Sequence, residues 1–357
     1  MMLKLKFIGL KMNSIKAARV RNLIIGGDAP LSVQTMYDDK IAGRDPGLIV
    51  ERINKLSMMG CDLIRFSFVS KDDAPVFKEI AKRSPIPVVA DIHFDYHMAL
   101  LALDSGADKV RINPGNIGVK WKTEEVVKAA KDHGAAIRIG LNTGSLPKHD
   151  SSKADYQVMV DSALEYIDDF ESWNFENIVV SLKSSDVETT VKAAKLFHEK
   201  SPYPLHLGVT EAGSVISSAV RTTWALGNLL TSHIGDTLRV SINGSIEDEV
   251  KCGVELLRTL GMRKSGVRVV ACPRCGRHTF DSHSFLSKIE NRLLTLDKPI
   301  TVAVMGCQVN GPGEAKNADF AVTGFGTKVF LYKKGMLYKE VTEENAEEEL
   351  FKVIDEQ

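Results

Sequence analysis

Short runs of β-branched and apolar residues alternate with longer amphipathic stretches along most of this chain. Each short run ends in polar residues, and each longer stretch carries apolar residues three and four positions apart, with a glycine or proline near most of its ends. The first pattern is typical of buried strands and the second of helices that pack on a sheet. The repeated strand–helix unit favours a parallel sheet covered by helices.

Eight such strands are expected in the first two thirds of the chain. They begin at Leu31, Leu63, Val88, Lys109, Ala136, Ile178, Leu205 and Leu238. Eight alternating units over about 260 residues predict an α/β fold of the (β/α)8 TIM-barrel class. We assign residues 1–263 to this barrel, as the substrate-binding domain. The N-terminal MMLKLKFIGLKMN is expected to be an extension or a first strand, because lysines interrupt its apolar residues.

The pattern changes between Gly261 and Gly266, and residues 264–357 predict a small α+β domain. Four further strands are expected to begin at Val267, Ile300, Asp319 and Lys328. The acidic C-terminal stretch predicts an amphipathic helix that packs through Leu350, Phe351 and Ile354.

Composition excludes several classes of protein. The 46 basic and 46 acidic residues cancel, which argues against a general polyanion binder. No run approaches the roughly eighteen apolar residues of a membrane span. Five cysteines, an odd number, do not fit the disulfide framework of a secreted protein, so we expect a reducing cytoplasm.

Polar residues occupy alternate positions near the carboxyl ends of the predicted strands, where barrel enzymes gather their inward-facing catalytic groups. These are Arg65 and Ser67, Asp91 and His93, Arg111 and Asn113, Arg138 and Asn142, Ser181 and Lys183, and Arg239 and Ser241. Because unpaired buried cations cost several kcal/mol, four arginines and a lysine at one mouth imply an anion with more than one negative charge. Guanidinium groups match phosphate or diphosphate oxygens. The alternatives are local pairing with Asp91 or Glu211, or an outward orientation.

Other roles stay open for some of these residues. Lys183 has the position of a Schiff-base lysine in barrel aldolases. His93 and His206 are candidate ligands, acids or core residues. Glu211 is a candidate general acid or an arginine partner.

Two cysteine motifs follow predicted strands of the second domain. ACPRCGR contains Cys272 and Cys275, and GCQVNGPGEA contains Cys307 and Glu314. Three thiolates with one carboxylate suit an iron-sulfur cluster that keeps one iron exchangeable, which indicates redox chemistry. A zinc site completed by His278, His283 or Glu314 is the alternative, and a zinc ribbon would also fit a nucleic-acid-binding module.

The two remaining cysteines, Cys61 and Cys252, have no ligand spacing and are expected to be structural. The segment MRKSGVRVVACPRCGRH, which contains five basic residues and no acidic one, is either ordinary surface or a dock for an acidic electron carrier.

Longer blocks resemble a known family. GGDAP, VVADIHFDYHMALLALDSGADKVRINPGNIG, NFENIVVSLKSSDV, YPLHLGVTEAG, IGDTLRVS, ACPRCGR and MGCQVNGPGEA together resemble bacterial 4-hydroxy-3-methylbut-2-enyl diphosphate synthases of the two-domain form, from about Val20 to about Gly326. The resemblance implies two-electron reductive ring opening and dehydration of 2-C-methyl-D-erythritol 2,4-cyclodiphosphate in non-mevalonate isoprenoid biosynthesis. It also implies flavodoxin or ferredoxin as electron donor, and a homodimer.

The resemblance further implies a 4Fe-4S cluster bound by Cys272, Cys275, Cys307 and Glu314, with Glu314 also taking part in catalysis. The substrate contacts that it implies are Arg65, Arg111, Asn113, Arg138, Asn142, Lys183, Arg239 and Ser241. We add His93 to these contacts and Glu211 to the catalytic residues as hypotheses.

Overall fold

A computed structural model describes residues 14–146, 152–326 and 328–356, and the chain divides into two compact units. The first runs to Arg263, except for residues 58–60, which group with the second unit that begins at Lys264. The N-terminal segment predicted to be an extension or first strand, residues 1–13, lies outside the described residues. No helix in the described segments has the length and apolar character needed to cross a membrane.

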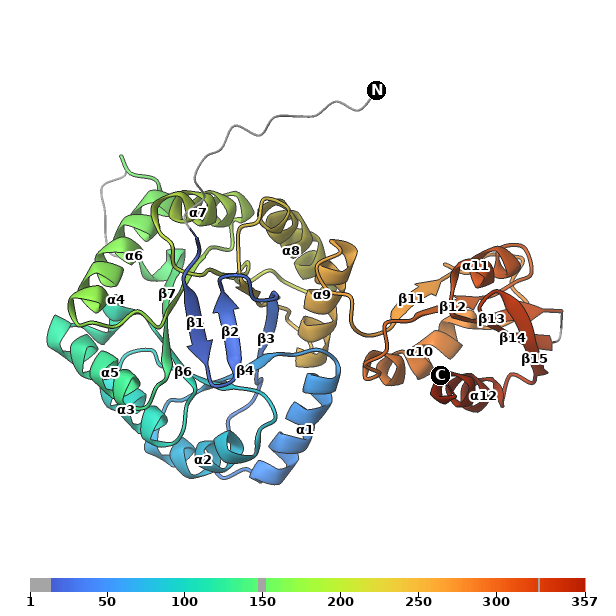
Figure 1. Ribbon diagram of the computed structural model, residues 1–357, viewed down its shortest axis with the longest axis horizontal. Helices are drawn as coiled ribbons and strands as arrows, with labels where there is room; N and C mark the ends of the chain where they lie inside the picture. Colours follow the sequence, from blue (N-terminus) through green and yellow to red (C-terminus); the bar gives the residue numbers. More distant parts are fainter. Residues whose placement is uncertain (1–13, 147–151, 327, 357) are drawn as a thin grey trace. The chain divides into compact units, whose positions relative to one another are not determined.

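Eight parallel strands form the centre of the first unit, and each predicted strand is present (Figure 1). They are β3 (Ser32–Met36), β4 (Leu63–Ser67), β5 (Val88–Asp91), β6 (Lys109–Ile112), β7 (Ala136–Asn142), β8 (Ile178–Lys183), β9 (His206–Leu207) and β10 (Thr237–Leu238). Their order in the sheet is β8-β7-β6-β5-β4-β3-β10-β9. A parallel bridge between Val180 and Leu205 joins the two ends of this order. The predicted TIM barrel is therefore confirmed.

Helices form the outer layer of the barrel (Figure 1). They are α1 (Pro46–Met58), α2 (Ala74–Arg83), α3 (Tyr96–Asp104), α4 (Pro114–Ile117), α5 (Lys120–Asp132), α6 (Asp155–Ser172), α7 (Val187–Lys200), α8 (Val215–Leu230) and α9 (Ile246–Thr259), with 3-10 turns η1 (Lys71–Asp73) and η2 (Thr143–Ser145). Helix α9 shows why these segments are helical. Ser245 caps it by accepting a hydrogen bond from the Asp248 N–H, and Val250, Val254 and Leu257 are buried on its inner face.

An antiparallel hairpin of β1 (Ala17–Val20) and β2 (Leu23–Gly26) precedes the barrel, and Figure 1 shows it lying across the barrel. Its Ala18, Val20 and Ile25 are fully buried in a cluster with residues from the starts of four barrel strands. Those residues are Leu63, Val89, Ala136 and Val179. The hairpin, which we did not predict, closes the amino-terminal end of the barrel.

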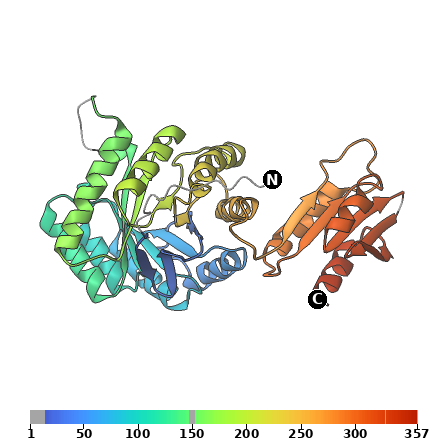
Figure 2. The same ribbon diagram turned by 45° about the horizontal axis from the view of Figure 1, so that its top comes forward.

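The second unit is a five-stranded mixed sheet with helices on both faces (Figure 2). Its strands are β11 (Arg268–Ala271), β12 (Thr301–Met305), β13 (Phe320–Phe325), β14 (Lys328–Lys333) and β15 (Met336–Val341), and its helices are α10 (Ser282–Leu294), α11 (Gly311–Asn317) and α12 (Ala346–Asp355). The first three strands are parallel, and β14 and β15 continue the sheet antiparallel. The four predicted strands and the α+β class are confirmed, and β15 is an additional edge strand.

Alternation along β12 distributes its side chains between two apolar clusters. Val302 and Val304 join the cluster that contains α10 and α12, whereas Ala303 and Met305 join the cluster that contains α11. Leu350, Phe351 and Ile354 are at most 1% exposed, which confirms how the predicted C-terminal helix packs.

Candidate active site

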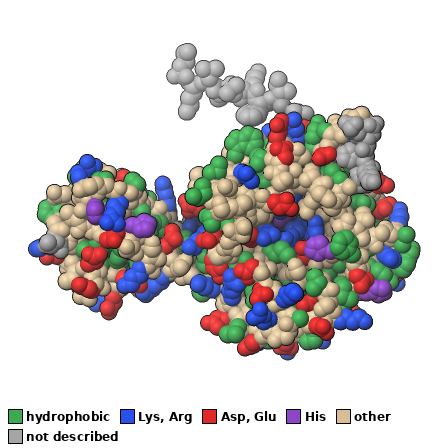
Figure 3. All heavy atoms as spheres, turned by 180° about the vertical axis from the view of Figure 1, so that it is seen from behind, with side chains coloured by type: hydrophobic (Ala, Val, Ile, Leu, Met, Phe, Trp, Pro, Cys, Tyr) green, Lys and Arg blue, Asp and Glu red, His purple; other side chains and the backbone are tan. Residues whose placement is uncertain are grey.

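Cationic side chains collect inside the barrel near the carboxyl ends of its strands. Arg65, Arg111, Arg138 and Lys183 are buried, and Arg239 directly follows β10 with its side chain 18% exposed. From the side opposite to Figure 1, Lys and Arg side chains are gathered in a hollow at the centre of this unit (Figure 3). Arg65 and Arg239 come from different strands but both contact the Met36 sulfur, and the charges of Arg138, Arg65, Arg239 and Arg111 all act on Lys183. Side chains from so many strands can converge in this way only on the inner face of the barrel.

Asp91 pairs with two of these arginines. Arg111 Nη1 lies 3.2 Å from Asp91 Oδ1, and Arg65 Nε lies 3.7 Å from Oδ2. Burial alone would raise the pKa of Asp91, but the charges of Arg65, Arg111 and Arg138 outweigh burial and bring the pKa to about 2. Asp91 is therefore an ionised carboxylate, and the alternative of local pairing holds for this pair of arginines.

A second buried carboxylate, which sequence reasoning missed, holds Arg239. Glu249 on α9 is 2% exposed and accepts hydrogen bonds from Arg239 Nε at 3.0 Å and from Nη2 at 2.7 Å. Such a fork-to-carboxylate pair fixes the plane of the guanidinium.

The remaining cations give the mouth an excess of positive charge. Within the described chain, Arg138 Nε and Nη1 are buried without a hydrogen-bond partner. Burial lowers the pKa of Lys183 well below its usual value, and the charges of the neighbouring arginines lower it further, so the ammonium form of Lys183 is favoured by an anion beside it. Among the described residues, these five basic side chains are paired with two carboxylates, Asp91 and Glu249, so the barrel can accept an anion with several charges.

Two glycines make space for these long side chains. A Cβ on Gly208 would lie 2.6 Å from Lys183 Nζ and 2.6 Å from the carbonyl oxygen of Arg239. A Cβ on Gly140 would overlap Arg111 Nε. Any side chain at either position would compete with a cation for the interior of the barrel.

Two of the predicted asparagines lie beside η2 at the mouth. Asn113 is 2% exposed, caps α4 by accepting from the Gly115 N–H at 3.1 Å, and donates to Ser145 Oγ at 3.2 Å. Asn142 is half-buried at the end of β7, and its carbonyl accepts a hydrogen bond from the same Ser145 hydroxyl. The loop after β7 is thus tied to the loop after β6.

The other candidates differ in exposure. Ser241 is half-buried, and its carbonyl oxygen accepts from Ser218 Oγ at 2.8 Å. The His93 side chain is 46% exposed, with Nε2 3.9 Å from Asp91 Oδ2. Glu211 is exposed with φ of 53°, a left-handed conformation that is uncommon for a residue with a side chain. His206 is 1% exposed inside the barrel, and neither ring nitrogen has a partner among the described residues.

In the second unit, three cysteines line one cavity of about 140 Å³. Cys272 and Cys275 follow β11, Cys307 follows β12, and Arg274, Arg277 and Asn310 contribute to the same wall. Parallel pairing of β11 with β12 brings the two motifs together, since both loops leave the same edge of the sheet.

The thiol of Cys272 differs from the two cysteines predicted to be structural. Burial would raise its pKa, but hydrogen bonds from the backbone N–H groups of Gly306 and Arg274 outweigh burial and lower the pKa. Burial raises the pKa of Cys61 to about 12 and also raises that of Cys252. The thiolate therefore forms more readily at Cys272 than at Cys61 or Cys252.

Glu314 lies in the first turn of α11, half-buried, and is not among the residues that line the cavity. The hydrogen bond from the Gly311 N–H to the Cys307 carbonyl links the start of this helix to the third cysteine. Among the described residues, no three His, Cys, Asp or Glu side chains are close enough together to hold a single metal ion.

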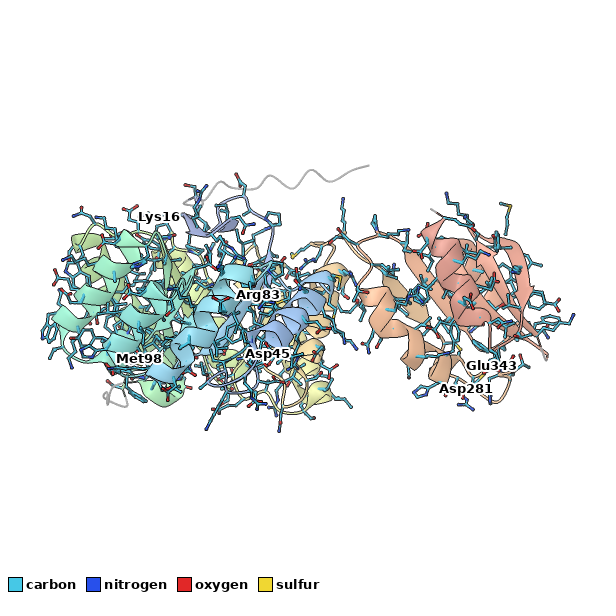
Figure 4. The ribbon with its side chains drawn as sticks, turned by 90° about the horizontal axis from the view of Figure 1, so that it is seen from below. Lys16, Asp45, Arg83, Met98, Asp281 and Glu343 are labelled. Atoms are coloured by element: carbon cyan, nitrogen blue, oxygen red, sulfur yellow. The ribbon has the colours of Figure 1, made fainter. Side chains whose placement is uncertain are left out.

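The basic segment around the cysteines is partly paired with acidic residues elsewhere. Arg263 lies 3.1 Å from Asp62, and Arg274 lies 3.1 Å from Asp281, which is labelled in Figure 4. The Arg274 side chain is nevertheless 43% exposed, and Arg277 is also exposed. Exposed surface charge therefore remains beside the cysteine cavity.

Comparison with known proteins assigns both units. The model of the GcpE TIM-barrel domain matches residues 15–254, and the model of the GcpE protein C-terminal domain matches residues 268–356. A solved dihydropteroate synthase of Xanthomonas albilineans is 14% identical, covers 69% of this chain and 97% of its own, and superposes with a TM-score of 0.50. At that identity the likeness concerns the barrel fold alone.

Curated relatives are similar over nearly their whole length. A protein of Treponema denticola is 42% identical, covering 96% of this chain and 97% of the relative. A protein of Caldanaerobacter subterraneus subsp. tengcongensis is 44% identical, covering 97% and 98%. Both are named 4-hydroxy-3-methylbut-2-en-1-yl diphosphate synthase (flavodoxin). The chain, with its cationic barrel and its cysteine-lined cavity, belongs to this family of synthases.

Proposed function

We propose that this chain reduces 2-C-methyl-D-erythritol 2,4-cyclodiphosphate to 4-hydroxy-3-methylbut-2-enyl diphosphate, using the barrel for the diphosphate and the cysteine cavity for a 4Fe-4S cluster. The reaction opens the ring, takes up two electrons and two protons and releases one water. Family membership implies an iron-sulfur oxidoreductase of non-mevalonate isoprenoid biosynthesis. It therefore displaces the zinc-stabilised aldolase and nucleic-acid alternatives.

One observation carries the barrel's part of the proposal: the five basic side chains Arg65, Arg111, Arg138, Lys183 and Arg239 are paired with two carboxylates, and Arg138 keeps buried donors without a partner in the described structure. A cyclic diphosphate supplies the missing negative charge and several acceptor oxygens. Holding it at Arg65, Arg111, Arg138, Lys183 and Arg239 keeps the opened chain in place and meets its developing charge with preorganised donors.

Polar groups at the mouth complete the substrate site in this proposal. Asn113, Asn142 and Ser241 would contact the hydroxyl and phosphate oxygens. Exposed His93 and Glu211 are candidates to supply protons to the leaving oxygen, because both stand at the ends of barrel strands with access to solvent.

The donor set of the cavity fits an iron-sulfur cluster. Cys272, Cys275 and Cys307 would hold three irons, and Glu314 the fourth, with the hard carboxylate as the replaceable ligand. When bound, such a cluster supplies electrons one at a time. The lowered pKa of Cys272 supports thiolate ligation.

The electron donor would be an acidic carrier, flavodoxin or, as the alternative, ferredoxin. Exposed Arg274 and Arg277 beside the cavity are the proposed dock, because opposite charges steer association. We also expect a homodimer in the cytoplasm, where thiols stay reduced.

Iron and sulfide analysis of anaerobically purified protein, followed by turnover of the cyclic diphosphate, tests the function. Four irons and four sulfides per chain are expected for the proposed cluster. Cys307→Ala should lose the cluster, Glu314→Ala should retain iron but lose most turnover, and Cys252→Ser serves as the matched control that retains both. Equal turnover by wild type and Glu314→Ala would exclude the proposed role of the carboxylate.

A further inference from the structure

Glu249 occupies a fully satisfied position behind the barrel mouth. Its Oε2 accepts from Thr35 Oγ1 at 2.6 Å and from Arg239 Nε at 3.0 Å. Its Oε1 accepts from Arg239 Nη2 at 2.7 Å and from the Ile242 N–H at 3.2 Å. Each oxygen thus receives two hydrogen bonds, and with 2% exposure little of the group reaches solvent.

These four bonds connect three different elements. Thr35 belongs to β3, Arg239 follows β10, and Ile242 lies in the loop before α9, which carries Glu249 itself. The carboxylate therefore joins a barrel strand, the mouth loop and the outer helix at one point. A displacement of Glu249 would be transmitted directly to the guanidinium.

The pair leaves one side of Arg239 available. Glu249 takes the edge formed by Nε and Nη2, whereas Nη1 lies 3.6 Å from the Met36 sulfur, which is a weak acceptor. Arg65 also directs Nε and Nη2 to the same sulfur, at 3.2 Å and 2.7 Å. An anion can therefore displace Met36 from both arginines without displacing Glu249.

We propose that Glu249 is a positioning residue for diphosphate binding, acting by holding Arg239 with Nη1 directed into the mouth. The inference rests on the proposed function and adds a residue that contacts no substrate atom. Thr35 supports it by filling the last acceptor position of Oε2.

Glu249→Gln tests this inference, because glutamine has the shape of glutamate but replaces one acceptor oxygen by an NH2 group, which cannot accept the hydrogen bonds that the neighbouring groups donate. Glu247→Gln is the matched control. Glu247 lies on the same helix and forms a similar forked pair, with Arg52 Nε and Nη2 each at 3.0 Å, but Arg52 belongs to α1 and not to the inward cations.

The measurements are KM for the cyclic diphosphate, kcat, and the inhibition constant of inorganic pyrophosphate. Glu249→Gln should raise KM and the inhibition constant by about tenfold or more, with kcat and iron content unchanged. Thr35→Val should raise KM and the inhibition constant by a smaller factor. Thr35→Ser, which keeps the hydroxyl, should leave KM and the inhibition constant at their wild-type values. Glu247→Gln should behave as wild type.

A double-variant cycle separates positioning from a general structural effect. In an Arg239→Met background, Glu249→Gln should change pyrophosphate binding no further, because the group it positions is gone. The inference would be overturned if Glu247→Gln weakened pyrophosphate binding as much as Glu249→Gln. It would also be overturned if Glu249→Gln still weakened binding in the Arg239→Met background, or if Glu249→Gln bound pyrophosphate more tightly than wild type. If wild type does not turn over the cyclic diphosphate, the proposed function fails, while pyrophosphate calorimetry still decides the role of Glu249.

Discussion

Adding a side chain at Gly208 is the most direct test of how the basic side chains are placed in the barrel. Gly208 follows β9, where the carbonyl of Arg239 and the ammonium of Lys183 approach it from two sides. Gly208→Ala adds one methyl group, with no change in charge or hydrogen-bonding capacity. Any effect must therefore come from the space that the methyl group takes.

The structure gives the size of the conflict. The added Cβ would lie 2.6 Å from both neighbours, about 0.8 Å inside the 3.4 Å at which ordinary contact begins. The Arg239 carbonyl is part of the barrel backbone, whereas Lys183 Nζ is the end of a flexible side chain. Lys183 must move instead. Overpacking of this kind costs about 1–3 kcal/mol, and a displacement near 1 Å at a reacting centre costs up to roughly 100-fold in rate.

Steady-state kinetics with the cyclic diphosphate, together with thermal unfolding, provide the assay. We expect Gly208→Ala to lower kcat/KM by about 10- to 100-fold, because Lys183 no longer reaches its place. Gly227→Ala is the control, since Gly227 lies within α8 and a Cβ there meets nothing within 4 Å. It should leave kinetics unchanged and raise the free energy of unfolding by about 0.5–1 kcal/mol.

Wild-type kcat/KM in Gly208→Ala would refute this reasoning. It would mean either that Lys183 does not contact the substrate or that the strands adjust without cost. If kinetics are unchanged but the protein is less stable, Lys183 does not contact the substrate. If both kinetics and stability are unchanged, the strands adjust without cost.

Three further predictions concern charge. Burial raises the pKa of Asp236 to about 6, so the contribution of Asp236 to stability is lost as pH rises from about 4 through 6. Asp236→Asn should therefore raise the free energy of unfolding in urea by about 2 kcal/mol at pH 8 but not at pH 4. Equal gains at both pH values would contradict this. Burial lowers the pKa of Lys109, whose Nζ has no partner among the described residues. Lys109→Met should therefore raise the free energy of unfolding at pH 7 by about 1–3 kcal/mol, with a gain that shrinks towards pH 10. A lower free energy of unfolding at pH 7 would refute this prediction. Arg274→Glu combined with Arg277→Glu should slow reduction by flavodoxin about tenfold or more at low salt while sparing a small chemical reductant, and equal slowing of both would exclude a dock.

The barrel strands could be predicted because they are buried on both sides and each ends in polar residues. The edge strand β15 could not, since five of its six residues are exposed and its composition lacks the alternation of a half-buried strand. The β1–β2 hairpin was missed for another reason. Its four-residue strands form a stable unit only through contacts with residues far along the chain.

The inward arginines could be predicted because strand alternation determines which side chains face the interior. Glu249 could not, because its partner Thr35 is 214 residues away and nothing in the pattern of α9 marks a buried carboxylate as functional. The importance of Gly208 could not be predicted either, because it depends on where the Lys183 ammonium lies in the folded barrel. The residue-by-residue roles of the mouth and of Glu314 remain predictions that the experiments above address.

The hairpin covers the amino-terminal end of the barrel and packs on the starts of its strands. Under the proposed function, the substrate would then enter, and water and the linear diphosphate would leave, past the arginines at the carboxyl ends of the strands. Free pyrophosphate and other small polyanions that bind to these arginines should therefore slow both substrate entry and product release. Turnover in a phosphate-rich medium would then depend on how quickly such ions leave these arginines, as well as on the chemistry.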